Sequence, residues 1–350
     1  MKKTSINSDL DDFSFENVVK SIVEEINERA NAMIASRFGF YDDEIKTLNQ
    51  IGDEYGISRE RVRQIVQEAI NKIKKKSKKD NLFEKAEEKI KFTIEKNYGI
   101  ITKKDLVKAL ITRNREGSFI DFILYCSENF DVIEDKYEME KTIIKIGFKM
   151  EKWKRVKENA KKVLEEKGEV LSSKTFFNKF SKIHSEISEG EFFTYMNISR
   201  EIKKGVFGKW GIATWGEINP KGVRQKAYLV IKESEEPLHF KKVAKMIDKY
   251  KLNEKKTHPQ TVHNELIKDD IFVLVGRGTY ALREWGYQRG TVKDVIEEIL
   301  KMSDNPVRQD EIVEKVLSVR DVKETTVIIN LNNFFEKIDK RKYFLKDEKK

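Results

Sequence analysis

Cysteine, histidine and proline are scarce in this sequence, and each scarcity excludes a class of protein. The single cysteine, Cys126, cannot form an internal disulfide, and one thiol with four histidines gives no set with the spacing of a zinc site. Because Cys126 stands in an apolar run, we expect a small buried residue rather than a reactive thiol. We expect neither a metal nor another cofactor. The four prolines are scattered, which predicts folded units joined by short turns.

Long apolar runs and catalytic residue sets are also absent. The longest apolar stretches, such as residues 122–126 and 271–275, fall far short of the roughly 18 residues that a bilayer span needs. No apolar signal core follows the start of the chain. The sequence also offers no Ser/His/Asp set, no nuclease-like cluster and no glycine-rich phosphate loop. We therefore expect a cytoplasmic protein that is not an enzyme, with no membrane partner and no small-molecule substrate.

Charge is abundant, and basic charge is concentrated in one segment. The chain has 350 residues and a net charge of +10. Residues 1–58 carry 6 basic and 12 acidic side chains, whereas residues 59–79 carry 9 basic and 2 acidic ones. Lysine outnumbers arginine 54 to 16, yet Arg59, Arg61 and Arg63 cluster together. Because the guanidinium fork suits phosphates and guanine edges, this cluster predicts a segment that faces a polyanion.

The same segment has the pattern of two helices joined by a tight turn. Thr47 begins a short helix, Gly56 can take the left-handed conformation that ends it, and Ser58 can cap a second helix. One face of the second helix is apolar and consists of Val62, Ile65, Val66, Ala69, Ile70 and Ile73. The opposite face, near the helix start, carries Arg59, Glu60, Arg63 and Gln64. This arrangement predicts a helix-turn-helix that enters a DNA major groove, and a solvated amphipathic helix is the alternative.

Two stretches, RFGF at residues 37–40 and KTLNQIGDEYGISRERVRQI at residues 46–65, carry a family resemblance. They resemble region four of primary bacterial sigma factors, the domain that reads the minus-35 promoter box and contacts the polymerase flap. The resemblance covers about residues 16–76 and implies that Arg59, Glu60 and Gln64 read bases. It implies backbone or supporting contacts for Thr47, Arg61 and Arg63. Near the phosphates we also expect Ser58, Lys72, Lys74 and Lys75.

The resemblance has two limits. The pattern departs at Val66, where these sigma factors usually carry an acidic residue, so the downstream edge of a binding site is less well defined. The stretch before the domain is too short for the sigma domains that bind the polymerase clamp and melt DNA. We expect that this chain does not initiate transcription alone.

An internal similarity organises the rest of the chain. Residues 211–217 resemble residues 278–287, with Trp215 and Trp285 seventy positions apart, which predicts repeated small domains. Each repeat has the order helix, short strand with a second helix, third helix and hairpin, which is typical of a winged helix. We predict a mainly α-helical fold with small β-hairpin wings. Its expected domains are a helix-turn-helix domain at residues 1–80 and winged helices at residues 81–150, 151–219, 220–288 and 289–350.

The third helices of the repeats differ in chemistry. The helix of the first repeat is apolar on nearly every side, and Glu189 and Glu191 open that of the second, so both repeats are expected to face protein or act as spacers. The third repeat, mainly residues 224–287, resembles the HARE-type winged helix found in the delta subunit of bacterial RNA polymerase. Secondary DNA contacts are assigned there to Gln260, Thr261, His263, Asn264 and Arg277. Protein contact or a plain scaffold is the alternative for this repeat.

These features together predict a sequence-specific DNA-binding regulator of transcription, associated with the nucleoid. Its partner is double-stranded DNA, and it reads an element like the minus-35 box through the helix that starts at Ser58. The alternative is an accessory factor that binds the RNA polymerase core, at the flap or in the manner of delta, with only non-specific DNA contact. The two hypotheses differ in whether tight binding needs a DNA sequence or needs polymerase.

Overall fold

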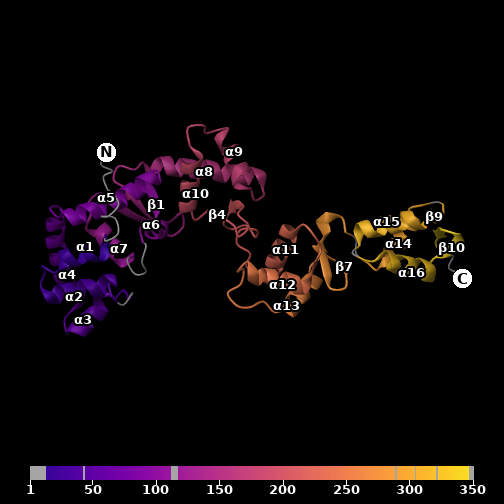
Figure 1. Cartoon of the computed structure of the whole chain (residues 1–350), viewed down its shortest axis with the longest axis horizontal. Helices are drawn as coiled ribbons and strands as arrows, with labels where there is room; N and C mark the ends of the chain where they lie inside the picture. The colour runs from indigo at the N-terminus through magenta and orange to yellow at the C-terminus, as the bar shows by residue number, and fades with distance from the viewer. Residues whose placement is uncertain are drawn as a thin grey trace, which may run out of the picture. The chain divides into compact units, whose positions relative to one another are not determined.

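The computed structural model describes residues 13–41, 44–111, 117–287, 290–303, 305–320 and 322–346 (Figure 1). The predicted fold class is confirmed, because the chain is mainly helical with small antiparallel sheets. It divides into two compact units, residues 1–203 and 204–350. This division is coarser than the five expected domains, whose bounds stay predictions. The first residues, on which the expected lack of a signal core depends, lie outside the described ranges.

The first four helices lie in the first unit and begin at side-chain caps. Their bounds are α1 (Phe15–Val23), α2 (Glu28–Phe38), α3 (Leu48–Tyr55) and α4 (Arg59–Ser77). The side chains of Ser14 and Asn27 accept hydrogen bonds from backbone N–H groups at the starts of α1 and α2. Such caps satisfy amides that have no partner within the helix. The apolar faces of all four helices then meet in one core.

The next segment contains three helices and a three-stranded sheet. Its elements are α5 (Asn81–Lys96), β1 (Ile100–Thr102), α6 (Lys103–Leu110), α7 (Gly117–Cys126), β2 (Phe130–Asp135) and β3 (Met139–Lys145). The strand order is β1-β3-β2, all antiparallel, with Ile101 opposite Ile143. The segment therefore has the helix, strand, helix, helix and hairpin order that the sequence predicts for a winged helix.

Helix α7 packs against α1, α2 and α4, so the first two expected domains share one hydrophobic core (Figure 1). The ring of Phe40 stacks on that of Phe119 with centroids 4.9 Å apart, and Phe38 meets Phe122 edge to face at 5.0 Å. Cys126 is buried in this core, as expected, and burial raises the pKa of its thiol to about 12. These contacts join the described residues between 15 and 143 in one packed body.

The remaining part of the first unit is held by the β2–β3 hairpin. It contains α8 (Met150–Lys167), α9 (Ser173–Ser181) and α10 (Glu189–Ile198). Strand β4 (Ile202–Lys204) lies at the boundary of the two units, and β5 (Trp210–Ile212) belongs to the second unit. The backbone N–H of Arg200 donates to the Glu138 carbonyl at 2.9 Å, and Arg200 Nε donates to the Met139 carbonyl at 2.8 Å. The hairpin is thus tied to the chain that follows α10.

The second unit repeats the same order of elements twice. Its first set is α11 (Val223–Ser234), β6 (Leu238–His239), α12 (Phe240–Lys249), α13 (Pro259–Lys268), β7 (Phe272–Gly276) and β8 (Thr279–Leu282). Its second set is α14 (Val292–Lys301), β9 (Val307–Arg308), α15 (Gln309–Val319), α16 (Glu324–Phe334), β10 (Glu336–Asp339) and β11 (Lys342–Phe344). The sheets are three-stranded, with orders β6-β8-β7 and β10-β11-β9, and each set has its own core. Among the described helices of the chain, none has the length and apolar character needed to cross a membrane.

Candidate nucleic-acid interface

The turn between α3 and α4 has the geometry that the sequence predicts. The Thr47 hydroxyl accepts from the Gln50 N–H while Gln50 Oε1 accepts from the Thr47 N–H, a reciprocal capping box. Gly56 ends α3 with φ +64°, a left-handed conformation that glycine adopts without strain. The Ser58 hydroxyl then accepts from the Arg61 N–H at 3.2 Å and starts α4. The turn between the two helices consists of the three residues 56–58.

Gly52 is a second glycine that this turn requires, and the sequence patterns did not reveal it. A Cβ at this position would lie 2.7 Å from the Ile57 carbonyl oxygen, well inside the contact distance of real Cβ atoms. The Ile57 N–H also donates to the Gly52 carbonyl at 3.0 Å. The small size of Gly52, within α3, therefore lets the turn before α4 pack closely against α3.

Helix α4 presents one buried and one exposed face. Val62, Val66, Ala69, Ile70 and Ile73 are buried, as predicted, and Ile65 is half-buried. The side chains at the start of the helix are all exposed: Ser58, Arg59, Glu60, Arg61, Arg63 and Gln64. The expected base-reading residues and three of the expected backbone residues, Ser58, Arg61 and Arg63, are thus brought together at this end of the helix, which we call the α4 start.

Hydrogen bonds join most of the side chains at the α4 start. Arg63 donates to both Glu60 carboxylate oxygens, with Nη2 2.8 Å from Oε1 and Nε 3.0 Å from Oε2. This hydrogen bond lowers the pKa of the Glu60 carboxyl and raises that of the Arg63 guanidinium. Arg61 donates to Gln64 Oε1 at 3.2 Å. Arg59 differs, because it makes no hydrogen bond or ion pair with any described residue, so all its donors are available to a ligand.

The lysines expected near phosphates lie at the other end of α4, roughly 20 Å from Arg59 at the helical rise per residue. Lys72 and Lys75 are exposed. Lys74 is half-buried, and its ammonium lies 5.2 Å from the centroid of the Tyr125 ring of α7. Lys72 and Lys75 are therefore better placed for solvent-side contacts than Lys74.

The third repeat presents the exposed start of α13. Gln260, Thr261 and Asn264 are exposed, and Gln260 Nε2 donates to Asn264 Oδ1 at 3.2 Å. His263 is half-buried instead, since its ring stacks on Phe240 with centroids 4.4 Å apart. Arg277 is exposed in the β7–β8 turn, next to Gly278 at φ +70°. Four of the five expected secondary residues thus point to solvent, and the fifth packs within the domain.

Two imidazole side chains cap helices in this repeat. His239 Nδ1 accepts from the Lys241 N–H at 3.2 Å at the start of α12, and His258 Nδ1 accepts from the Gln260 N–H at 3.3 Å at the start of α13. For His258, the proline at position 259 indicates the helix start in the sequence, because proline favours the first turn of a helix.

The third helices of the first two repeats, α7 and α10, pack against other elements of the first unit, and Glu189 at the start of α10 is exposed. Helix α7 buries most of its side chains against the N-terminal helices. Helix α10 packs against β1 and α8, and Glu191 accepts from Lys152 Nζ at 2.5 Å and from the Tyr195 hydroxyl at 2.8 Å. These carboxylate bonds lie inside the unit.

Comparison with known families confirms both resemblances. Residues 22–75 match the model of Sigma-70, region 4. Residues 223–285 match the HARE-HTH model, an HTH domain named after ASXL and restriction endonuclease proteins, among others. Both matched families are helix-turn-helix domains and neither is an enzyme family. The N-terminal and C-terminal parts of this chain thus each contain a helix-turn-helix domain.

Curated proteins similar to this chain include RNA polymerase sigma factors. The chain is 47% identical over 57 residues to the RNA polymerase sigma factor RpoD of Helicobacter pylori, a match covering 16% of this chain and 8% of that protein. It is 41% identical over 61 residues to the RNA polymerase sigma factor sigB of Arabidopsis thaliana, covering 17% of this chain and 11% of that one. The chain thus spans only a small fraction of the relatives it matches.

Proposed function

We propose that this protein is a sequence-specific DNA-binding regulator of transcription, and that the α4 start reads an element like the minus-35 box. The observation that supports this most is the exposed, capped start of α4, with the uncommitted Arg59 beside Glu60 and Gln64. A major groove accepts a helix in this way, and its base edges present the matching donors and acceptors. The proposal includes a cytoplasmic, nucleoid-associated protein without catalytic activity or cofactor.

Each side chain at the α4 start has a role that follows from its chemistry. Arg59 donates its fork to the O6 and N7 atoms of a guanine, Glu60 accepts from a cytosine amino group, and Gln64 pairs with an adenine or its neighbour. Glu60 and Gln64 exchange their bonds with Arg63 and Arg61 for bonds to bases. Exposed pairs contribute little to stability, so the exchange is inexpensive, and it leaves both arginines free to bind phosphates.

Further phosphate contacts come from both ends of the motif. Thr47 and Ser58 lie at helix starts, where backbone N–H groups and the helix dipole favour an anion. Lys72, Lys74 and Lys75 add positive charge at the far end of α4. The exposed α13 residues Gln260, Thr261 and Asn264, with Arg277 in the hairpin turn and His263 beside them, form a second and weaker contact.

The second candidate function is association with RNA polymerase. It is favoured by the similarity to proteins named as RNA polymerase sigma factors. In that case the chain binds the polymerase core, at the flap or as the delta subunit does, and touches DNA without sequence preference. The two functions are compatible. They differ in whether activity requires the α4 start to read a DNA sequence.

Selection of duplexes from a random library, at near-physiological salt, tests the first proposal. Salt at that level weakens non-specific phosphate binding, so a recovered motif reports base reading. We expect the full-length protein to recover one short motif and the variant with Arg59→Ala, Glu60→Ala and Gln64→Ala to recover none. A charge-neutral control with Lys85→Ala and Glu88→Ala, on the exposed face of α5, should behave as the unaltered protein.

A polymerase pull-down separates the two candidates. A factor that acts only through polymerase retains core polymerase when Arg59, Glu60 and Gln64 are all alanine, and it yields no motif in the selection. Recovery of nothing beyond salt-sensitive, sequence-blind binding by the unaltered protein contradicts the proposed DNA reader.

A further inference from the structure

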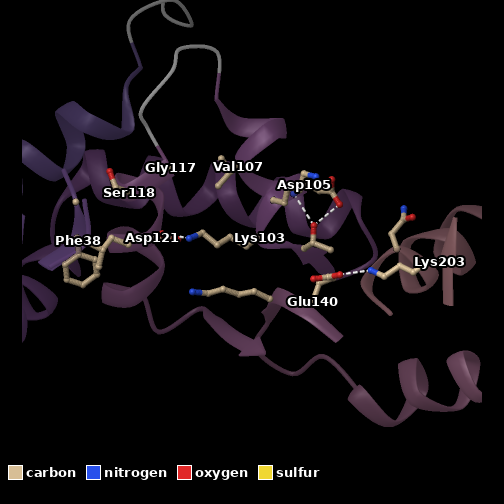
Figure 2. Close-up of a pocket in the computed structure, with 15 residues that line it drawn as sticks. Phe38, Lys103, Asp105, Val107, Gly117, Ser118, Asp121, Glu140 and Lys203 are labelled. Atoms are coloured by element: carbon tan, nitrogen blue, oxygen red, sulfur yellow. Dashed lines mark hydrogen bonds and ion pairs between the residues drawn. The ribbon is translucent and has the colours of Figure 1, made fainter. Parts of the chain in front are cut away.

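A cavity of about 890 Å³ lies in the first compact unit, apart from the α4 start (Figure 2). Its walls come from the end of α2, the start of α6, the start of α7 and β3, with Lys203 at one side. None of the residues proposed to contact DNA lines it. Its size is in the range of small-molecule sites, roughly 300–1,000 Å³. The cavity is therefore large enough for a ligand of its own.

The carboxylates that line the cavity already have partners. Lys103 Nζ donates to Asp121 Oδ2 at 2.5 Å and Lys203 Nζ donates to Glu140 Oε1 at 2.5 Å, and Figure 2 shows both lysines directed at these carboxylates. Asp105 accepts from the Thr102 hydroxyl at 2.7 Å. Each acidic group in the lining is thus engaged by a donor from the lining itself.

Two further lysines in the lining have no carboxylate partner among the described residues. Lys104 at the start of α6 and Lys141 on β3 make no hydrogen bond or ion pair with any described residue. The lining as a whole holds four lysines and three carboxylates, so its net charge is positive. Since ammonium groups bind carboxylates and phosphates through charge-assisted hydrogen bonds, an anion is the complementary ligand.

The cavity also has apolar walls and a polar group without a partner. Phe38, Ile45 and Val107 line it, and Ile45 is 61% exposed although its side chain is large and apolar. The buried Ser118 hydroxyl has no hydrogen-bond partner among the described residues.

We infer that this cavity binds a small organic anion, in which a carboxylate or phosphate is joined to an apolar group. The anionic group pairs with Lys104 and Lys141, and the apolar group covers Phe38 and Ile45. Such a ligand contacts α2, α6 and β3 together. Because it binds only the folded unit, it also stabilises that unit.

Fluorescence titration with 8-anilinonaphthalene-1-sulfonate, an aromatic sulfonate, tests the inference on the full chain without DNA. We expect one saturable site from which salicylate, an aromatic carboxylate, displaces the probe and benzyl alcohol does not. Lys104→Gln and Lys141→Gln should each weaken binding on the order of tenfold, as expected for loss of a charge-assisted bond. Ile45→Ala should weaken binding as well.

Lys108→Gln is the matched control, because Lys108 is an exposed lysine of α6 that does not line the cavity. It should leave probe binding unchanged. The inference is wrong if no saturable site exists, or if Lys108→Gln weakens binding as much as Lys104→Gln. If the probe does not bind but Lys104→Gln with Lys141→Gln weakens binding to random duplex, these lysines belong to a DNA path instead. No arm depends on sequence-specific DNA reading, so this result is independent of the proposed function.

Discussion

Helices α4 and α7 both lie in the first compact unit, yet of the two only α4 keeps a polar surface at its start. In α4, three arginines, a glutamate and a glutamine are exposed around the helix start. In α7, Phe119, Ile120, Phe122, Ile123 and Leu124 are buried, and the apolar surface of the N-terminal helices covers them. Helix α7 therefore serves as the support on which α4 is held. The burial of α7 in the core thus leaves the start of α4 exposed to solvent.

The largest expected effect comes from breaking the support. Phe122→Ala removes a fully buried ring that contacts both Phe38 and Phe40, and we expect a loss of about 3–5 kcal/mol in the stability of the first unit. Hydrogen exchange, followed by mass spectrometry, should show faster exchange of the amides in α1, α4 and α7 together. Ile267→Ala, which trims a 59% exposed apolar side chain of α13, is the control and should stay within about 0.5 kcal/mol. Unchanged protection of α4 in Phe122→Ala contradicts the shared core.

The next effect is on recognition rather than stability. Arg59→Ala should cost about 1–3 kcal/mol on the selected duplex and relax the preference at one base position. Lys75→Ala should instead weaken binding to all duplexes alike and lower the salt dependence by about one phosphate contact. Binding titrations over a series of salt concentrations measure both effects. Equal losses on the selected and a random duplex for Arg59→Ala contradict its role in base reading.

A smaller effect distinguishes the start of α4 from the start of α10. Ser58 and Ser188 both cap a helix by accepting from the N–H three residues later, in α4 and α10 respectively. Alanine at either position should cost about 0.5–2 kcal/mol in stability, because the same backbone donor loses its partner. Only Ser58→Ala should also weaken binding to the selected duplex, since only α4 carries the proposed reading residues. A matching loss of duplex binding in Ser188→Ala contradicts the separation of the two helices.

Local features of this comparison were predictable from the sequence, and distant ones were not. Thr47, Gly56 and Ser58 act within a few residues of themselves, so their types and spacing predict the caps and the turn. The apolar character of α7 indicated burial, but its partners Phe38 and Phe40 lie about eighty positions earlier, and no local pattern names them. The cavity beside α6 was not predictable either, because its walls come from segments far apart in the chain.

The smallest expected effect tests whether α13 contacts DNA, as proposed for α4, or serves as a packing surface, as α7 does. Its start is exposed like that of α4, but Gln260 and Asn264 bond to each other and the helix itself contains no arginine. Because these amides lack the forked charge that makes Arg59 effective, replacing both with alanine should weaken binding to the selected duplex only on the order of threefold, below the effect of a bidentate base contact. The recovered motif should stay unchanged. A changed motif would make α13 a second reading helix, and no loss at all would make it a surface for protein. The threefold result, with an unchanged motif, is what a helix lying along the phosphates produces, because such contacts add affinity without selecting a base.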